Sequence, residues 1–235
     1  MGSEMKPVHF FHIPKTSGRF FVVNSILILE HEFLIRGIDY GPLLKGFGHL
    51  SPKPLDTEDI MAFTFLREPV SRTVSHYLHI LNNQLTDDIE YDKSKFIRFL
   101  HENPTDPIID YQTKYIIYSG NEEVIDIYSK DFYPENLEDA DLDFAKNRLS
   151  KVDFIFDVSQ QGENLVRKVT DILYQHFNFV PSSDVQNLNL QYPPIMNPQS
   201  KVLYDSLTSQ EKSEIESLLV YDMNLYNSTT FSEIN

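Results

Sequence analysis

The sequence predicts an α/β fold built on a parallel β-sheet, in a single domain that spans residues 1–235. Short apolar runs alternate along the chain with longer segments whose apolar residues recur at helical spacing. In two places an apolar run passes through a short polar turn directly into a helical pattern, which is the arrangement of a βα unit. With 235 residues, of which 41% are hydrophobic, one domain can bury a substantial core.

The first βα unit consists of the apolar run at residues 8–11, a turn of Pro, Lys, Thr, Ser and Gly, and a second apolar run at residues 20–29. We expect strand, loop and helix in that order. Backbone N–H groups of such a loop meet the positive end of the helix dipole, and Lys15 adds a full charge. The turn is therefore a candidate phosphate site. Its spacing does not fit a P-loop NTPase, because Lys15 precedes Gly18 and no earlier glycine stands at the required distance.

The second βα unit begins with a strand candidate at residues 60–66, and Arg67 follows it. Residues 70–81 have apolar side chains at helical spacing, and the preceding proline suits a first helical turn. Again a strand places a cation at the start of a helix. Ser71 and Ser75 are four residues apart, so both can lie on one helix face. From these residues alone, Arg67 could equally pair with a carboxylate while the serines face solvent.

The rest of the chain is predicted more coarsely. We expect a strand at residues 152–158 and a polar connector at residues 81–91. Residues 181–198 are rich in Asn, Ser, Gln and Pro and are expected to form a long loop, which suggests a functional lid. Further helices are expected at residues 93–101, 107–119, 121–130, 139–149, 160–177, 199–206 and 208–226.

The two turns resemble the signature loops of sulfotransferases that use 3′-phosphoadenosine 5′-phosphosulfate (PAPS). Lys-Thr-Ser-Gly at residues 15–18 is similar to the family's 5′-phosphosulfate loop, Pro-Lys-Thr-Gly-Gly-Thr. Leu-Arg-Glu-Pro-Val-Ser-Arg at residues 66–72, with Ser-His-Tyr at residues 75–77, resembles its 3′-phosphate motif, Leu-Arg-Asp-Pro-x-x-Arg followed by Ser-His/Tyr-Tyr. The most similar branch includes the heparan and dermatan 2-O-sulfotransferases. Beyond residue 80 only the overall pattern of elements is similar.

This resemblance implies a P-loop-like three-layer α/β fold, in which helices flank a central parallel sheet. It also implies transfer of the sulfonyl group of PAPS to a hydroxyl, which leaves 3′-phosphoadenosine 5′-phosphate (PAP), and it implies no metal. Lys15 and the 16–20 backbone would hold the 5′-phosphate and sulfonate, while Arg67 and Ser75 would hold the 3′-phosphate. The cofactor-binding residues that the resemblance implies are Lys15, Thr16, Ser17, Gly18, Arg19, Phe20, Arg67 and Ser75.

The chain departs from the family at Arg19 and Phe20, where the relatives usually have Thr or Ser. A hydroxyl that would bind the 5′-phosphate is therefore missing. Arg19 can replace it with a charge-assisted hydrogen bond. In the other interpretation Arg19 points to solvent and the affinity for the cofactor is lower.

The resemblance implies His49 and Lys15 as catalytic residues. The 2-O-sulfotransferase branch has a Gly-His-Val/Leu segment between the two motifs, and its histidine is the catalytic base; here Gly-His-Leu stands at residues 48–50. The chemistry also asks for such a group, because an acceptor hydroxyl loses a proton as its oxygen attacks sulfur. Lys15 would stabilise the leaving phosphate oxygen. Other histidines compete for the role of base, but His9 and His12 are expected to be structural residues of the first strand.

Composition restricts the partners of the protein. A net charge of −15 disfavours nucleic acid and long polyanionic glycans, since both need an extended basic surface. A saccharide or another small hydroxyl compound is the expected acceptor. The chain has no cysteine, hence no disulfide and no thiolate metal ligand. It has no apolar run long enough to cross a bilayer and no signal peptide, so the sequence predicts no membrane span and a cytoplasmic protein.

Two other functional classes remain open from the sequence. A nucleotide or nucleoside kinase also uses an anion loop between a strand and a helix, although the spacing around Lys15 weighs against it. A non-catalytic PAP-binding protein of the same fold would account for Arg19 and Phe20. Neither the identity of the acceptor nor the oligomeric state follows from the sequence.

Overall fold

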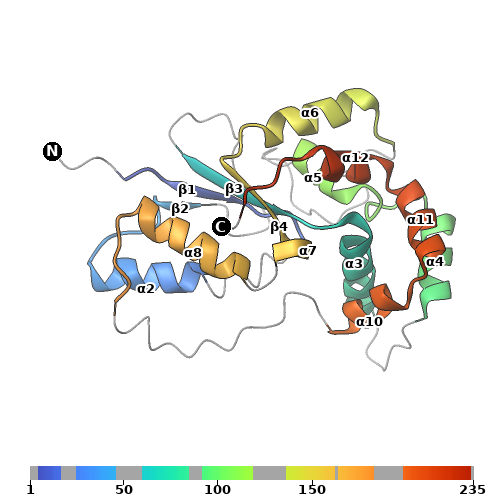
Figure 1. Cartoon of the computed structure of the whole chain (residues 1–235), viewed down its shortest axis with the longest axis horizontal. Coiled ribbons are helices and arrows are strands. Elements are labelled where there is room, and N and C mark those ends of the chain that lie inside the picture. Colours follow the sequence, from blue (N-terminus) through green and yellow to red (C-terminus); the bar gives the residue numbers. More distant parts are fainter. Residues whose placement is uncertain are drawn as a thin grey trace.

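The structure is a computed structural model, and it confirms the α/β class, since it combines parallel strands with helices that lie between and after them in the chain (Figure 1). It describes residues 5–16, 25–45, 60–84, 92–118, 136–161, 164–182 and 198–233. The strands are β1 (Val8–Phe11), β2 (Leu44–Lys45), β3 (Met61–Leu66) and β4 (Phe154–Asp157). The helices are α2 (Leu27–Ile35), α3 (Pro69–Gln84), α4 (Lys93–Glu102), α5 (Tyr111–Tyr118), α6 (Asp139–Leu149), α7 (Val158–Gln161), α8 (Asn164–His176), α10 (Pro198–Ser206), α11 (Ser209–Leu218) and α12 (Val220–Ser228).

All the described strands run parallel, in the spatial order β2-β1-β3-β4. The register pairs Phe10 with Phe63, and Phe63 with Phe154. After β1 the chain moves to β2 on one side, and it then returns to β3 on the other side of β1. The loops after β1 and β3 therefore diverge at a topological switch point, where open α/β sheets bind their ligands. Lys15 follows β1 and Arg67 follows β3, so both cations belong to this point.

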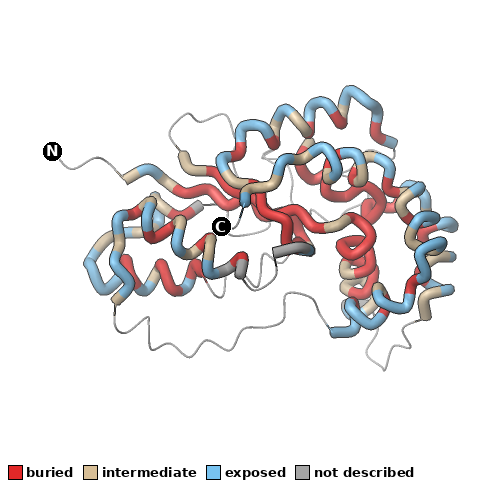
Figure 2. Tube along the Cα trace, in the orientation of Figure 1, coloured by how far each residue is buried: buried red, intermediate tan, exposed pale blue. Residues whose placement is uncertain are grey.

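Helices cover both faces of the sheet. Side chains alternate along a strand, and Phe10 and Phe63 face α2 and α8, whereas Phe11 and Ala62 face α5, α6 and α12. Figure 1 shows these two groups of helices on opposite sides of the strands. The strands between them are almost wholly buried (Figure 2). This double cover explains why the strands appear in the sequence as near-continuous apolar runs.

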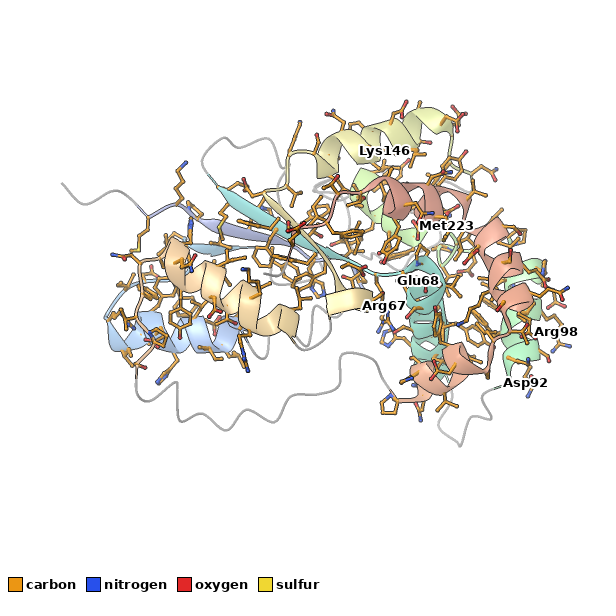
Figure 3. The ribbon with its side chains drawn as sticks, in the orientation of Figure 1. Arg67, Glu68, Asp92, Arg98, Lys146 and Met223 are labelled. Carbon is orange, nitrogen blue, oxygen red and sulfur yellow. The ribbon has the colours of Figure 1, made fainter. Side chains whose placement is uncertain are left out.

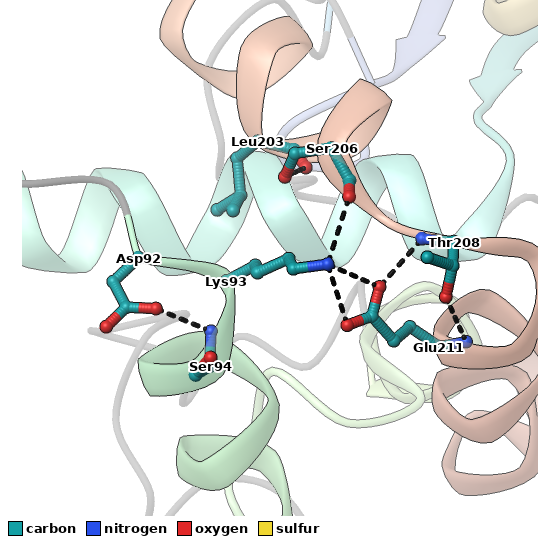
Figure 4. Close-up of polar contacts among 7 residues, drawn as sticks. All are labelled: Asp92, Lys93, Ser94, Leu203, Ser206, Thr208 and Glu211. Carbon is teal, nitrogen blue, oxygen red and sulfur yellow. Dashed lines mark hydrogen bonds and ion pairs between the residues drawn. The ribbon is translucent and has the colours of Figure 1, made fainter.

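A third core lies beyond the carboxyl ends of the strands, where α3 packs with α4, α10 and α11. Lys93, at the start of α4, donates to the Ser206 carbonyl at 3.4 Å and to Glu211 at 3.0 Å (Figure 4). Glu211 also accepts from the Thr208 N–H and so completes the capping box of α11. These contacts join α4 to α10 and α11, and both of the latter also pack on α3, the helix that begins just after Arg67.

Most predicted elements are confirmed with small shifts at their ends. The predicted strands at residues 60–66 and 152–158 are β3 and β4, and the first strand coincides with β1. The predicted helices at residues 93–101 and 139–149 are α4 and α6, and residues 199–206 form α10. Of the helix predicted from residue 20, the structure describes α2, which begins at Leu27. The helix at 121–130 and nearly all of the predicted loop at 181–198 lie outside the described residues.

Some boundaries were wrong for physical reasons. The helix expected at 107–119 begins only at Tyr111, because Asp110 has a φ of 50° and no α-helix can continue through that conformation. The helix expected at 208–226 breaks at Leu219, whose ψ is 44°. Residues 81–84 belong to α3 and not to a connector. The described residues of the predicted helix at 160–177 belong to α7 and α8. The two-residue strand β2 is too short to produce a periodic pattern.

No helix in the described ranges has the length and apolarity that a bilayer crossing requires.

Candidate functional site

The turn after β1 is held by hydrogen bonds within itself. Thr16 donates its N–H to the Ile13 carbonyl at 3.4 Å and its hydroxyl to the same oxygen at 2.6 Å. Thr16 is fully buried, whereas Lys15 is half-buried. Lys15 has a φ of 67°, which a residue other than glycine adopts rarely and at a free-energy cost of about 1–3 kcal/mol. Such strained residues are often found at ligand sites, so this backbone conformation agrees with a functional turn.

Arg67 joins this turn to the start of α3. Its side chain emerges where β3 meets α3 (Figure 3), and only 4% of the residue is exposed. Its Nη1 donates to the Lys15 carbonyl at 3.2 Å, and its Nε donates to the Ser71 hydroxyl at 3.0 Å. The structure therefore brings together two turns that lie far apart in the sequence. They meet at the switch point between β1 and β3.

The charge of Arg67 is not balanced within the described chain. Both of its side-chain acceptors are neutral oxygens, and no carboxylate of the described residues forms an ion pair with it. Burial lowers the pKa of Arg67 to about 10; the charge of Glu68 opposes this effect and that of Arg72 adds to it. A buried cation is unfavourable unless an anion compensates its lost hydration. The pairing of Arg67 with a carboxylate, which the sequence left open, is thus not found in this part of the protein.

Glu68 is the helix cap of α3 and not the partner of Arg67. Its two carboxylate oxygens accept the N–H groups of Val70 at 2.9 Å and of Ser71 at 2.7 Å. Burial raises the pKa of Glu68, while these backbone hydrogen bonds lower it. The acidic position of the Leu-Arg-Glu-Pro segment therefore has a structural role: it fixes the first turn of the helix that bears Ser71.

Arg72 and His76 are buried side chains of α3, the helix that also bears Ser71. Arg72 donates to the Ile108 carbonyl at 3.0 Å, bonds to Nδ1 of His76, and lies 4.1 Å from the centre of the Tyr111 ring. Burial lowers the pKa of His76 well below its usual value, and the charges of Arg72 and Lys15 lower it further. His76 is therefore neutral and accepts from Arg72. The positive charges of Lys15 and Arg72 thus both act on His76.

Other predicted site residues are placed only in part. Ser75 is half-buried, one turn beyond Ser71 on α3, and no hydrogen bond from it is found within the described residues. His9 and His12 are buried, and the ring of His12 stacks on Phe10 with centroids 5.0 Å apart, in keeping with structural roles. The remaining candidates, which lie outside the described residues, are Ser17, Gly18, Arg19, Phe20 and His49.

No sequence signal pointed to Gln112, which is part of the candidate site. Its Oε1 accepts the Arg67 N–H at 3.1 Å, and its Nε2 donates to the Arg67 carbonyl at 2.9 Å. Gln112 is 45 residues from Arg67 in the chain and lies inside a segment with an ordinary helical pattern. Only the tertiary packing of α5 against the β3–α3 turn brings these residues together, so no local pattern could have identified it.

No family model, no curated protein and no solved structure matches this chain. Its function is therefore inferred from the geometry of these residues and from the resemblance of the two motifs.

Proposed function

We propose that the chain is a PAPS-dependent sulfotransferase, which moves the sulfonyl group of PAPS to a hydroxyl of a saccharide or another small acceptor. The observation that carries the proposal is the buried guanidinium of Arg67. It has no carboxylate partner in the described chain, and it contacts the turn of Lys15. A nucleotide with phosphate groups at both the 5′ and the 3′ positions would supply one anion to each turn. The resemblance of the same two turns to PAPS-binding motifs selects this nucleotide among phosphorylated ligands.

The proposal includes a P-loop-like three-layer fold. It is supported by the parallel strand order β2-β1-β3-β4 and by helices that pack on both faces of the sheet. It is also supported by the position of Lys15 and Arg67 after the carboxyl ends of neighbouring strands, where ligands bind in sheets of this type.

In the proposed reaction an acceptor oxygen attacks the sulfur of PAPS. A bond forms between this oxygen and sulfur, and the bond from sulfur to the 5′-phosphate oxygen breaks. Lys15 stabilises the negative charge that grows on the leaving phosphate oxygen, and His49 takes the proton of the acceptor hydroxyl. PAP then leaves with both phosphate groups. Because sulfonyl transfer, like phosphoryl transfer, has little covalent chemistry for the protein to perform, correctly placed charges are the main contribution.

The proposal is tested by comparing PAP with ADP as ligands in a thermal unfolding assay. At a hundredfold excess over its Kd, PAP should stabilise the fold by about 2.7 kcal/mol, whereas ADP should stabilise it much less because it lacks the 3′-phosphate. Arg67→Ala should remove this difference. Arg98→Ala is the matched control, since Arg98 is an exposed arginine on α4 whose ion-pair partner is Glu102 (Figure 3).

Equal shifts with PAP and ADP would contradict the 3′-phosphate assignment. Binding of ATP with Mg²⁺ in the absence of PAP binding would identify a kinase instead. Tight PAP binding without turnover of labelled PAPS on any acceptor would identify a non-catalytic binding protein.

A further inference from the structure

Two peptide groups at the β3–α3 turn are held by side chains from distant parts of the chain. Gln112 bonds to both the N–H and the carbonyl of Arg67, at 3.1 and 2.9 Å. The hydroxyl of Ser159 accepts the N–H of Glu68 at 2.8 Å. These peptide groups lie past the end of β3, so the ladder of the sheet does not pair them. Side chains replace the missing strand partner.

The Gln112 contact is itself fixed by α12. Asp222 of α12 accepts the N–H of Gln112 at 3.2 Å, and it accepts the N–H and the hydroxyl of Thr113, each at 2.8 Å. Asp222 thus caps the first turn of α5 from another helix. Gln112 lies in that turn and is 1% exposed. The cap therefore fixes the backbone position from which the Gln112 side chain extends.

The Ser159 contact also leads to α12. Tyr226 donates its hydroxyl to Asp157 at 2.6 Å, and the other carboxylate oxygen of Asp157 accepts the N–H of Ser159 at 2.8 Å. Asp157 is the last residue of β4 and is buried. Helix α12 therefore contacts both of the segments that hold the β3–α3 turn.

We propose that Gln112 is a positioning residue of the anion site and that α12 holds it in place. Gln112 fixes the two peptide groups that flank Arg67, so that the guanidinium points to the Lys15 turn before any ligand arrives. A cation that is already oriented loses less conformational freedom when an anion binds, and the affinity is higher. The identity of the ligand rests on the proposed function. The positioning role rests on the hydrogen bonds alone.

The test replaces Gln112 with a side chain of similar length that cannot form these bonds. Gln112→Met is measured by hydrogen exchange of the Arg67 amide and by the Kd for PAP. We expect the Arg67 amide to exchange about tenfold faster and the Kd to rise about tenfold, with the amides of β3 unchanged. Asn103→Leu is the control: it removes an amide donor to the Phe99 carbonyl, at 2.8 Å, at the end of α4. It should change neither quantity.

A double variant separates positioning from general stability. In an Arg67→Ala background, Gln112→Met should cause no further loss of PAP affinity, because it acts only through Arg67. Additive losses would overturn the proposal, and so would an unchanged Arg67 exchange rate or an unchanged Kd in the single variant. If Gln112→Met does not fold, Gln112→Asn, which keeps the amide but is one methylene shorter, is measured in the same way.

A titration with a second anion tests the positioning role of Gln112 independently of the proposed function. Inorganic sulfate is titrated and followed through the Nε–H signal of Arg67. If the unmodified protein does not bind PAP, the proposed function is wrong, and the sulfate titration then decides the positioning role. A tenfold weaker response of Arg67 to sulfate in Gln112→Met supports positioning. An equal response in both proteins, or no response in either, overturns it.

Discussion

Glu32 and Arg67 are both buried charges, but their surroundings differ in kind. Glu32 of α2 is fully buried and is bonded by Arg36, by the Tyr174 hydroxyl at 3.1 Å and by the Ser182 N–H at 2.7 Å. Its charge is therefore balanced by a cation and by further donors. Arg67, which is nearly as buried, contacts only neutral oxygens in the described chain.

The pKa directions of the two groups express this difference. Burial acts to raise the pKa of Glu32, yet hydrogen bonds from Ser182, Arg36 and Tyr174 outweigh it, and the net pKa is lowered. For Arg67 no contact outweighs burial, and its pKa is lowered to about 10. The charge of Glu32 is thus compensated in a structural contact that joins α2, α8 and the segment after α8. The second is a charge without an anionic partner among the described residues, which is the property expected of a group that binds an anionic ligand.

The largest effect is expected within the anion site itself, at Lys15. Lys15→Ala should reduce turnover of PAPS by about 10²–10³-fold, because in the proposed reaction Lys15 acts on charge that grows in the transition state. The Kd for PAP should change much less. Lys95→Ala, which removes an exposed lysine of α4, is the control for a general loss of positive charge. Steady-state kinetics and a PAP titration measure both quantities, and a Kd that rises as much as turnover falls contradicts this role.

Arg67→Met tests the uncompensated charge. Loss of a charged hydrogen bond should weaken PAP binding by about 1.5–3 kcal/mol. The free protein should be as stable as before or more stable, since an apolar chain of similar length replaces a buried cation that has no anionic partner among the described residues. Calorimetric titration and denaturant unfolding give the two values. A large loss of stability in the ligand-free protein would show that the charge of Arg67 is already compensated in the fold.

Glu32→Gln tests the compensated charge, and the sign of the stability change should be opposite. Loss of the carboxylate leaves Arg36 without its counter-ion, and we expect unfolding to become easier by about 1–3 kcal/mol, with PAP affinity unchanged. The contribution of Glu32 is present above the ordinary glutamate pKa and is lost as the pH falls below that range, because its folded pKa is lowered. Glu30→Gln on the same helix is the control, and unfolding curves at several pH values provide the measurement. A Glu32 variant as stable as this control would remove the contrast between the two regions.

Asp110 is an intermediate case, because its charge is only partly balanced. Burial raises its pKa from 3.8 to about 7, the nearby charge of Asp222 adds to this, and Lys114 opposes it. Between these two pH values the folded protein keeps a proton that the unfolded chain has released, so the free energy of unfolding falls as the pH rises. Asp110→Asn can still accept the Asp222 N–H and should flatten this dependence. Unfolding measured from pH 4 to pH 7 checks it, and an unchanged slope would contradict the assignment.

Features that depend on neighbouring residues in the sequence were predicted, whereas features that depend on contacts between distant residues were not. The strands β1 and β3 and the turns at Lys15 and Arg67 were predicted because apolar runs and turn residues are local signals. The start of α5 was not, because α5 begins only after Asp110, which has a positive φ and a side chain that accepts the N–H of Asp222, 112 residues away. Gln112 was missed for the same reason. The sequence indicated which cations belong to the candidate site, but not which neutral groups hold them.

The smallest expected effect concerns Thr73, a buried polar group without charge. Thr73 lies in α3 and is 0% exposed, and its hydroxyl has no hydrogen-bond partner in the described part of the protein. Thr73→Val keeps the branched shape and removes a buried, unpaired hydroxyl, so the fold should be more stable by about 1 kcal/mol. Thr64→Val is the matched control: the Thr64 hydroxyl is also fully buried but donates to the Phe11 carbonyl at 2.7 Å, and its loss should destabilise by a similar amount. Denaturant unfolding decides between the signs. If Thr73→Val is destabilising, the Thr73 hydroxyl has a partner. The lack of an observed partner for a buried polar group would then no longer separate functional from structural positions of α3 and its neighbours.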